Sequence, residues 1–331
     1  MAKFSIFVTL FFIPSLLALD PYTKFTLLNL PPGPIGPESV ALDRFSQGPY
    51  AGVSDGRILV YKGSDTGFVD FAYTAPNRTK QLCDGTTNVT LGPTCGRPLG
   101  FSFNTLTGVL FIVDTFLGLF AVGPNGGRAT LLSDSAGGVR FNFLTGIDVA
   151  PITGEVVFTD GSLNFDFRNV IEQNAPTNDS SGRLMTYNPI TKQVKVLQDK
   201  LPVPIGPVFN FDSTFVLYSD IYAKRVVKYW LTGPKANTNE VLLNLPGRPI
   251  KIKRATTAGE FWVAVNIFVD QPPSITPFGY KFNSCGDVLL IKELQREYNN
   301  TEITVVQEYN DGNTLLVGSR TVTYVGIYTK S

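Results

Sequence analysis

The sequence predicts an all-β fold, a six-bladed β-propeller with four-stranded blades around a central channel. Short runs of Val, Ile, Phe, Tyr and Leu alternate with turns rich in Gly, Asn, Asp and Pro, and no long amphipathic helix stands out. A strand–turn–strand unit also recurs six times. A large β-sandwich is the rival architecture, but a repeated unit favours closure into a ring.

The six copies begin near residues 38, 99, 145, 206, 251 and 305, at intervals of 45 to 61 residues. A four-stranded blade takes about 40–50 residues, and loops account for the excess. In chain order the copies open with ESVALDRFSQGPYAGVSDGRILVYKG, LGFSFNTLTGVLFIVD, LTGIDVAPITGEVVFTD, GPVFNFDSTFVLYSD, IKIKRATTAGEFWVAVN and TVVQEYNDGNTLLVGS.

Two segments fall outside this repeat. Strand-forming residues near 25–30 precede the first copy, and we expect them to complete the last blade and close the ring. The insert at 165–182, FDFRNVIEQNAPTNDSSG, predicts a loop with one short helical turn. With 331 residues, 43% of them hydrophobic, the chain is long enough for one large core, and we expect a single propeller domain over residues 19–331.

The first 18 residues are typical of a secretory signal peptide. Lys3 precedes an apolar run from Phe4 to Leu17, and Ala18 lies just before Asp20-Pro21. A retained membrane anchor is the alternative. The pattern predicts a protein of the secretory pathway, vacuolar or extracellular, with no membrane attachment after the signal is removed.

Secretion predicts disulfides and glycans. Cys83 and Cys95 bracket the polar loop CDGTTNVTLGPTC and are expected to pair, which leaves Cys285 as a free cysteine. We expect Cys285 to be buried and inert, with a reactive thiol as the alternative. Four Asn-X-Ser/Thr sequons predict N-glycosylation in surface loops, at Asn77, Asn88, Asn178 and Asn299.

The composition excludes several classes of function. The 28 basic and 27 acidic residues nearly cancel, so nothing indicates a nucleic-acid partner or an anionic membrane surface. The chain has no histidine, which excludes Ser-His-Asp and Cys-His nucleophiles and histidine metal ligands. Acid–base chemistry must therefore use Asp, Glu, Lys, Tyr or a thiol. No cofactor is expected.

Several motifs resemble strictosidine synthase and the wider plant strictosidine synthase-like group, over nearly the whole chain that follows the signal. They include GPESVALD, DGRILVYKG, CGRPLGFSFNTLTGVLFIVD, TGEVVFTD, GRLMTYNP and GEFWVAV. The resemblance implies a six-bladed propeller, a disulfide at Cys83 and Cys95, and a secretory or vacuolar address. It leaves the reaction open, because one fold hosts many functions.

Some relatives of this group are calcium-dependent lactonases and esterases, and the resemblance assigns their metal ligands to four positions. Glu38 keeps the metal glutamate, whereas Thr145 and Ile205 stand at the next two positions, and the last falls on Ile250 or Lys251. This donor set is too poor in oxygen for calcium, so we expect no metal. Our hypothesis is that the ammonium of Lys251 replaces the metal's charge beside Glu38. Alternatively, Lys251 and Lys253 form a solvated strand face.

Strictosidine synthase itself joins an amine to an aldehyde by Pictet–Spengler condensation, using one acid–base glutamate. Aligned on the last hairpin, that glutamate falls on Thr304, and the synthase's pocket tyrosine falls on Thr145. The nearest upstream acid is Glu302, on the same strand face and about 7 Å away, while Glu308 is expected to be structural. The chain is therefore not expected to be a true strictosidine synthase.

Three functions remain open for a small-molecule ligand in the channel. The first is an enzyme of specialised, alkaloid-type metabolism that condenses an amine with an aldehyde, with Glu302 as its acid–base group. The second is a binding propeller without catalysis, and the third is a lactonase- or esterase-type hydrolase. The Pro-rich segment 268–280 is either a lid over the channel or a rigid surface loop.

Overall fold

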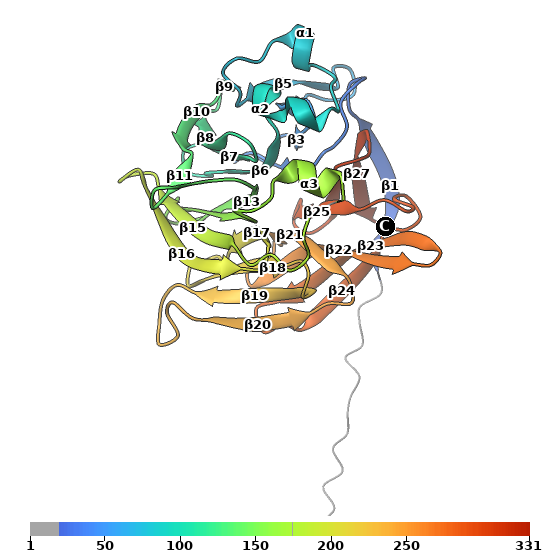
Figure 1. The fold of residues 1–331 in the computed structure, drawn as a ribbon. Helices are drawn as coiled ribbons and strands as arrows, with labels where there is room; N and C mark the ends of the chain where they lie inside the picture. The colour runs from blue at the N-terminus through green and yellow to red at the C-terminus, as the bar shows by residue number, and fades with distance from the viewer. Residues whose placement is uncertain (1–19, 174) are drawn as a thin grey trace, which may run out of the picture.

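The computed structural model describes residues 20–173 and 175–331, which form six small antiparallel sheets around a common axis (Figure 1). The predicted all-β propeller is therefore confirmed. The predicted signal peptide lies outside the described residues. Among the described residues, no helix is long and apolar enough to cross a membrane.

The first three blades follow one another along the chain, each with its inner strand first. Blade 1 contains β2 (Ser39–Ala41), β3 (Tyr50–Gly52), β4 (Arg57–Tyr61) and β5 (Phe68–Tyr73), with β9 (Gly127–Arg128) added parallel to β5. Blade 2 contains β6 (Pro98–Phe103), β7 (Leu110–Asp114), β8 (Gly118–Val122) and β10 (Thr130–Ser133). Blade 3 contains β13 (Leu144–Val149), β14 (Val156–Asp160), β15 (Gly182–Asn188) and β16 (Gln193–Leu201).

The last three blades complete the ring. Blade 4 contains β17 (Pro204–Phe209), β18 (Phe215–Asp220), β19 (Arg225–Trp230) and β20 (Asn239–Asn244). Blade 5 contains β21 (Arg248–Arg254), β22 (Glu260–Asp270), β23 (Pro273–Asn283) and β24 (Val288–Glu293). Blade 6 contains β25 (Ile303–Tyr309), β26 (Thr314–Ser319), β27 (Tyr324–Lys330) and, from the other end of the chain, β1 (Tyr22–Asn29).

The ring closes as the sequence predicts, because β1 pairs antiparallel with β27. The Tyr22 hydroxyl lies 2.9 Å from Oε1 of Glu308 on the inner strand and 2.8 Å from the carbonyl of Gly312, and its ring packs edge-on against Trp262 of blade 5 at 6.0 Å. Glu308 is buried and also accepts hydrogen bonds from the Thr256 backbone and from Lys281. These contacts agree with a structural role for Glu308 and explain why the two chain ends form one blade.

Neighbouring inner strands approach so closely that two positions require glycine. A Cβ on Gly146 would lie 2.7 Å from the Cα of Gly206, and a Cβ on Gly206 would lie 2.4 Å from the Cα of Lys251. Gly206 also has a φ of +57°, in the left-handed region that favours glycine. This packing fixes the separation of the inner strands and so the positions of side chains at their ends.

All six inner strands begin on the same face of the ring, which we call the entry face. In each blade, the turn between the second and third strands and the connection to the next blade also lie there. The short helices α1 (Lys80–Cys83), η1 (Val89–Leu91), α2 (Gly92–Cys95) and α3 (Phe167–Ile171) belong to these connections. The hairpin of β11 (Ser135–Ala136) and β12 (Val139–Arg140) lies between blades 2 and 3.

The predicted disulfide is confirmed, since Cys83 and Cys95 are bonded with their Cα atoms 5.4 Å apart. The expectation for Cys285 is wrong, because this free cysteine is exposed in the turn after β23. All four sequon asparagines are exposed, and all four lie in loops of the entry face.

The Pro-rich segment is a β-hairpin and not the loop that both expectations assumed, although its tip lies at the start of the channel, where the lid alternative placed it. Strands β22 and β23 continue through it as a paired hairpin up to Asp270 and Pro273. Proline is tolerated here because the hairpin extends beyond its neighbouring strands. The expected helical turn in 165–182 is present as α3, which lies near the centre of the ring in Figure 1.

Candidate functional site

A cavity of about 700 Å³ opens at the entry face, where the channel begins; we call it the entry cavity. Its lining includes the channel positions singled out from the sequence, namely Glu38, Thr145, Ile205, Lys251, Glu302 and Thr304. The inner strands bring these residues together from different blades. The structure thus gathers into one site the residues that the sequence could only place at repeat starts.

The floor of the cavity holds a buried ion pair. Nζ of Lys251 lies 3.1 Å from Oε1 of Glu38 and donates a 2.8 Å hydrogen bond to the Glu38 carbonyl. The two residues are only 3% and 6% exposed. Burial lowers the pKa of Lys251, and the adjacent Glu38 carboxylate opposes that shift. The hypothesised contact is therefore present.

The alternative of a solvated lysine face is wrong, because Lys253 is buried as well. Burial lowers the pKa of Lys253 to about 8, while the carboxylate of Asp148 acts in the opposite direction. Both lysines lie on β21 at alternate positions, so both point the same way from the strand. Their proximity adds a further lowering of the Lys253 pKa.

The two threonines of the floor hold the backbone of neighbouring blades. Oγ1 of Thr304 donates to the Glu38 carbonyl at 2.9 Å, and Oγ1 of Thr145 lies 2.9 Å from the Pro204 carbonyl and 2.8 Å from Oγ1 of Thr159. Neither hydroxyl has a base beside it in the structure. Their contacts give them a positioning role in the floor, not the role of a proton carrier.

Glu302 lies at the cavity wall, immediately before β25, and forms an ion pair with Arg320. Its side chain is 11% exposed and that of Arg320 is 22% exposed. The Arg320 guanidinium therefore holds the Glu302 carboxylate in place at the cavity wall.

The walls of the cavity are mostly apolar. Helix α3 begins with a capping box, in which Asp166 accepts from the Arg168 backbone at 2.8 Å and Asn169 accepts from the Asp166 backbone at 3.0 Å. This start places Phe167 and Val170 one turn apart on the side that lines the cavity. This wall was not predicted from the sequence, although the two phenylalanines of the polar insert, Phe165 and Phe167, were a usable signal.

A second wall is the tip of the β22–β23 hairpin, part of the segment considered as a lid, which contributes Phe268, Val269, Pro273 and Ile275. At its base, the guanidinium of Arg248 stacks 4.5 Å from the ring centre of Phe268. Arg320 and Tyr222 also line the cavity and were not identified from the sequence. No periodic pattern marks these two positions, since Tyr222 lies in a turn and Arg320 in a bend.

The positions that the resemblance assigns to metal ligands do not fit a calcium ion. The Lys251 ammonium occupies the space beside Glu38, and Ile205 and Ile250 bring no side-chain oxygen. Within the residues that the structure describes, no group of three His, Cys, Asp or Glu side chains has a metal-binding arrangement. No step of a reaction is therefore derived through a metal.

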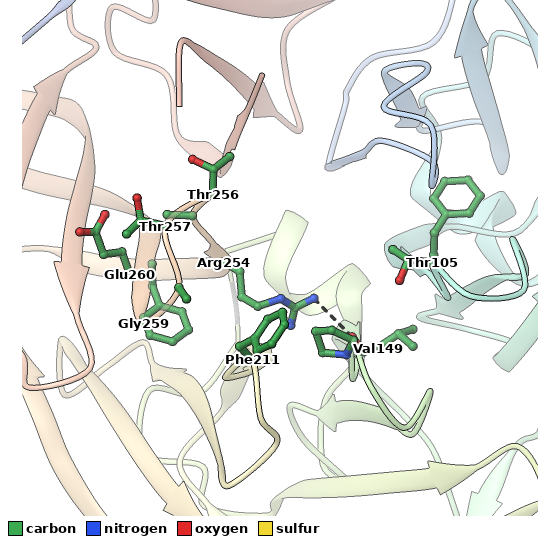
Figure 2. A pocket seen from close by; sticks show the side chains of 13 residues that line it. Thr105, Val149, Phe211, Arg254, Thr256, Thr257, Gly259 and Glu260 are labelled. Atoms are coloured by element: carbon green, nitrogen blue, oxygen red, sulfur yellow. Dashed lines mark hydrogen bonds between the residues drawn. The ribbon is translucent and has the colours of Figure 1, made fainter. Parts of the chain in front are cut away.

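A smaller pocket of about 330 Å³ lies at the opposite end of the channel (Figure 2). Figure 2 shows Arg254 extending across it toward Val149, whose carbonyl accepts a 3.3 Å hydrogen bond. The same guanidinium forms an ion pair with Asp148, which also accepts from the Phe209 backbone at 3.0 Å. This pocket is smaller than the entry cavity, and none of the channel positions singled out from the sequence lines it, so it is not the candidate site.

Comparisons with known proteins identify relatives in plants. A family profile described as strictosidine synthase matches residues 145–234, and one described as strictosidine synthase-like, N-terminal, matches residues 23–61. Protein strictosidine synthase-like 12 of Arabidopsis thaliana is 39% identical over 92% of this chain and 89% of its own length. Strictosidine synthase of Catharanthus roseus is 37% identical over 88% of this chain and 82% of its own length.

Solved structures share the fold at much lower identity. A gluconolactonase from Xanthomonas campestris matches with a TM-score of 0.64 at 13% identity, over 95% of this chain and 96% of that one. A calcium-binding protein, regucalcin, from Agrobacterium tumefaciens matches with a TM-score of 0.62 at 13% identity, over 94% and 96%. At this level of sequence identity, the matches show only that the fold is shared.

Proposed function

The chain belongs to the strictosidine synthase-like family, and from that premise we propose that its entry cavity binds a small, largely apolar organic molecule. The observation that carries the proposal is the cavity itself, which is open between the inner strands and not filled by side chains. Its volume of about 700 Å³ falls within the range of small-molecule sites. Apolar walls supply affinity, and the few polar groups of the floor orient the ligand.

The buried pair of Lys251 and Glu38 supports this proposal. A desolvated ion pair is costly, and hydrophobic residues of similar size would often be as stable. Oε2 of Glu38 is buried and has no hydrogen-bond partner in the described part of the chain. A ligand with a hydroxyl or N–H group would satisfy this oxygen.

A screen by native mass spectrometry tests ligand binding. The protein is incubated with panels of small amines, aldehydes, lactones and carboxylic acids, and bound masses are recorded. We expect one-to-one complexes with molecules that fit the cavity. The control is Ile221→Trp, which fills the cavity from a partly buried wall position. Complexes that persist equally in this variant would place the binding elsewhere.

A second candidate function is the condensation of an amine with an aldehyde. The amine nitrogen attacks the carbonyl carbon, water leaves to give an iminium ion, and ring closure then releases a ring proton. Glu302 favours this function because it lines the cavity and is the nearest acid upstream in the chain of Thr304, the position that the resemblance assigns to the synthase's glutamate. In this mechanism Glu302 accepts the released proton while Arg320 is displaced.

Mixing amine and aldehyde panels with the protein tests the condensation. Mass spectrometry should detect a product lighter than the two reactants together by one water, and Glu302→Gln should lower its formation about 100-fold or more. Equal product formation in both proteins would remove Glu302 as the acid–base group. The hydrolase alternative rests on the fold it shares with a lactonase, and hydrolysis of the lactone panel tests it directly.

We also place the protein in the secretory pathway, in the vacuole or outside the cell, as part of specialised, alkaloid-type metabolism. The disulfide of Cys83 and Cys95 supports an oxidising compartment, and the four exposed sequons support glycosylation. Treating the protein purified from plant cells with a peptide-N-glycosidase should increase its mobility on a gel. An unchanged mobility would contradict this placement.

A further inference from the structure

Several cations lie in or beside the entry cavity, and not all have a carboxylate partner. Arg248 lines the cavity and stacks on the rings of Tyr222 and Phe268, with no ion pair to a described carboxylate. Lys251 pairs with Glu38, and Arg320 pairs with Glu302. Arg97, just before the inner strand of blade 2, is 5% exposed, and its guanidinium makes no ion pair or hydrogen bond with any described residue. Its Nε atom is buried without a partner.

None of the carboxylates near Arg97 forms an ion pair with its guanidinium. Asp114 accepts the Arg97 backbone N–H at 2.7 Å and the Thr74 hydroxyl at 2.5 Å, so it binds the main chain and not the guanidinium. Asp55 is paired with Arg57 at 2.5 Å. Glu38 attracts Arg97 electrostatically, but its Oε1 is taken by Lys251, and its Oε2 reaches no donor.

Arg97 is not itself among the residues that line the cavity, but its guanidinium lies directly against one of them. Its Cζ lies 5.1 Å from the ring centre of Phe167, and both Phe167 and Leu99, which follows Arg97 on the same strand, line the cavity. An aromatic ring thus holds the guanidinium in place of an acid. Burial and the positive charge of Arg320 lower the pKa of Arg97, while Glu38 opposes this shift.

A guanidinium stays protonated in proteins, so Arg97 cannot avoid its burial by losing a proton. A buried charge without a hydrogen-bonded acid partner is costly, and a carboxylate is the anion whose geometry matches a guanidinium in two parallel hydrogen bonds. We propose that the ligand of the entry cavity is an apolar molecule bearing a carboxylate, and that this carboxylate pairs with Arg97. The inference rests on the proposed function, since it names the chemical class of the ligand for the same cavity.

Isothermal titration with matched pairs of compounds tests the inference. The probes are 3-phenylpropanoate, 4-phenylbutanoate and octanoate, each compared with its primary amide and with the amine of the same chain length. The acids should bind the wild-type protein about tenfold or more tightly than their amides, the range expected for a charge-assisted hydrogen bond. Arg97→Gln should reduce this preference to about twofold or less.

The matched control is Arg296→Gln, which removes the same charge from a side chain that is 91% exposed, and it should keep the full preference. A preference that survives in Arg97→Gln, or is equally lost in the control, overturns the inference. Binding of amides or amines without the acids overturns it too, but leaves ligand binding in the cavity intact. No binding of any probe contradicts both proposals.

A second variant covers the case in which Arg97→Gln does not fold. If the guanidinium awaits a ligand, Arg97→Met should leave the Tm of the ligand-free protein unchanged or raise it, because the methionine removes a buried charge without a partner. A Tm lowered by more than about 5 °C would show that Arg97 is instead a structural residue of the apo protein, and would overturn the inference.

Discussion

The ammonium of Lys251 lies 3.1 Å from the carboxylate of Glu38, although 213 residues separate them in the chain. Lys251 belongs to blade 5 and Glu38 precedes the first strand of blade 1, so the pair spans the start of the channel. This contact sets the charge of the cavity floor.

Lys251→Met should destabilise the protein by about 3–5 kcal/mol, because it leaves the Glu38 carboxylate buried without a partner. The double variant Glu38→Gln/Lys251→Met should be less destabilised than the sum of the single variants. Urea unfolding at pH 7 measures both. If the loss of unfolding free energy in the double variant equals the sum of the losses in the single variants, Glu38 and Lys251 do not interact as an ion pair.

The buried amine of Lys253 should make the stability of the protein depend on pH. Burial lowers its pKa to about 8 in the folded protein from the 10.5 of an ordinary lysine, so between these values the unfolded chain binds more protons. Stability should therefore rise with pH across this window, and the penalty is fully present below pH 8. Lys253→Met should stabilise the protein at pH 7 by about 1–3 kcal/mol and remove part of the rise. Urea unfolding between pH 7 and 10.5 measures both effects. If the unfolding free energy of Lys253→Met rises with pH as steeply as that of the wild-type protein, the prediction for a buried Lys253 amine is wrong.

Gly206→Ala should be strongly destabilising, by about 3 kcal/mol or more, because the new Cβ would lie 2.4 Å from the Cα of Lys251 and φ is +57°. The control is Gly63→Ala, where φ is +96° but nothing lies within 4 Å of the new Cβ. It carries only the conformational cost, about 1 kcal/mol. Thermal unfolding compares the two, and equal losses would refute the close packing of the inner strands.

Cys285 should react in the native protein, because it is exposed in the turn after β23. A thiol reagent added without denaturant should label one sulfhydryl, and Cys285→Ser should abolish the labelling. Labelling only after unfolding would restore the buried position that the sequence suggested.

The repeat, the disulfide and the closing strand could be predicted because each depends on local patterns. Turn residues recur in each of the six copies, and Cys83 and Cys95 flank one short loop. Cys285 could not be placed, since a lone cysteine in a turn has the same local pattern whether it is covered or exposed.

The floor of the entry cavity was predictable, whereas its walls were not. Glu38, Lys251 and Thr304 stand at repeat starts, so the propeller geometry alone brings them together. Arg97, Arg320 and the β22–β23 hairpin depend on how irregular loops fold over the entry face. Loop conformation is set by tertiary contacts that no periodicity in the sequence reports.

The most direct test of the central claim is a titration of one ligand from the screen into wild-type protein, Ile221→Trp and Ile190→Trp. Ile221 lines the entry cavity, whereas Ile190 is 88% exposed in the β15–β16 turn at the opposite end of the ring. We predict that Ile221→Trp weakens binding at least about tenfold, since the indole fills the ligand's volume, and that Ile190→Trp leaves binding unchanged. Unchanged binding to Ile221→Trp, with the variant folded, would contradict the claim that the entry cavity is the functional site.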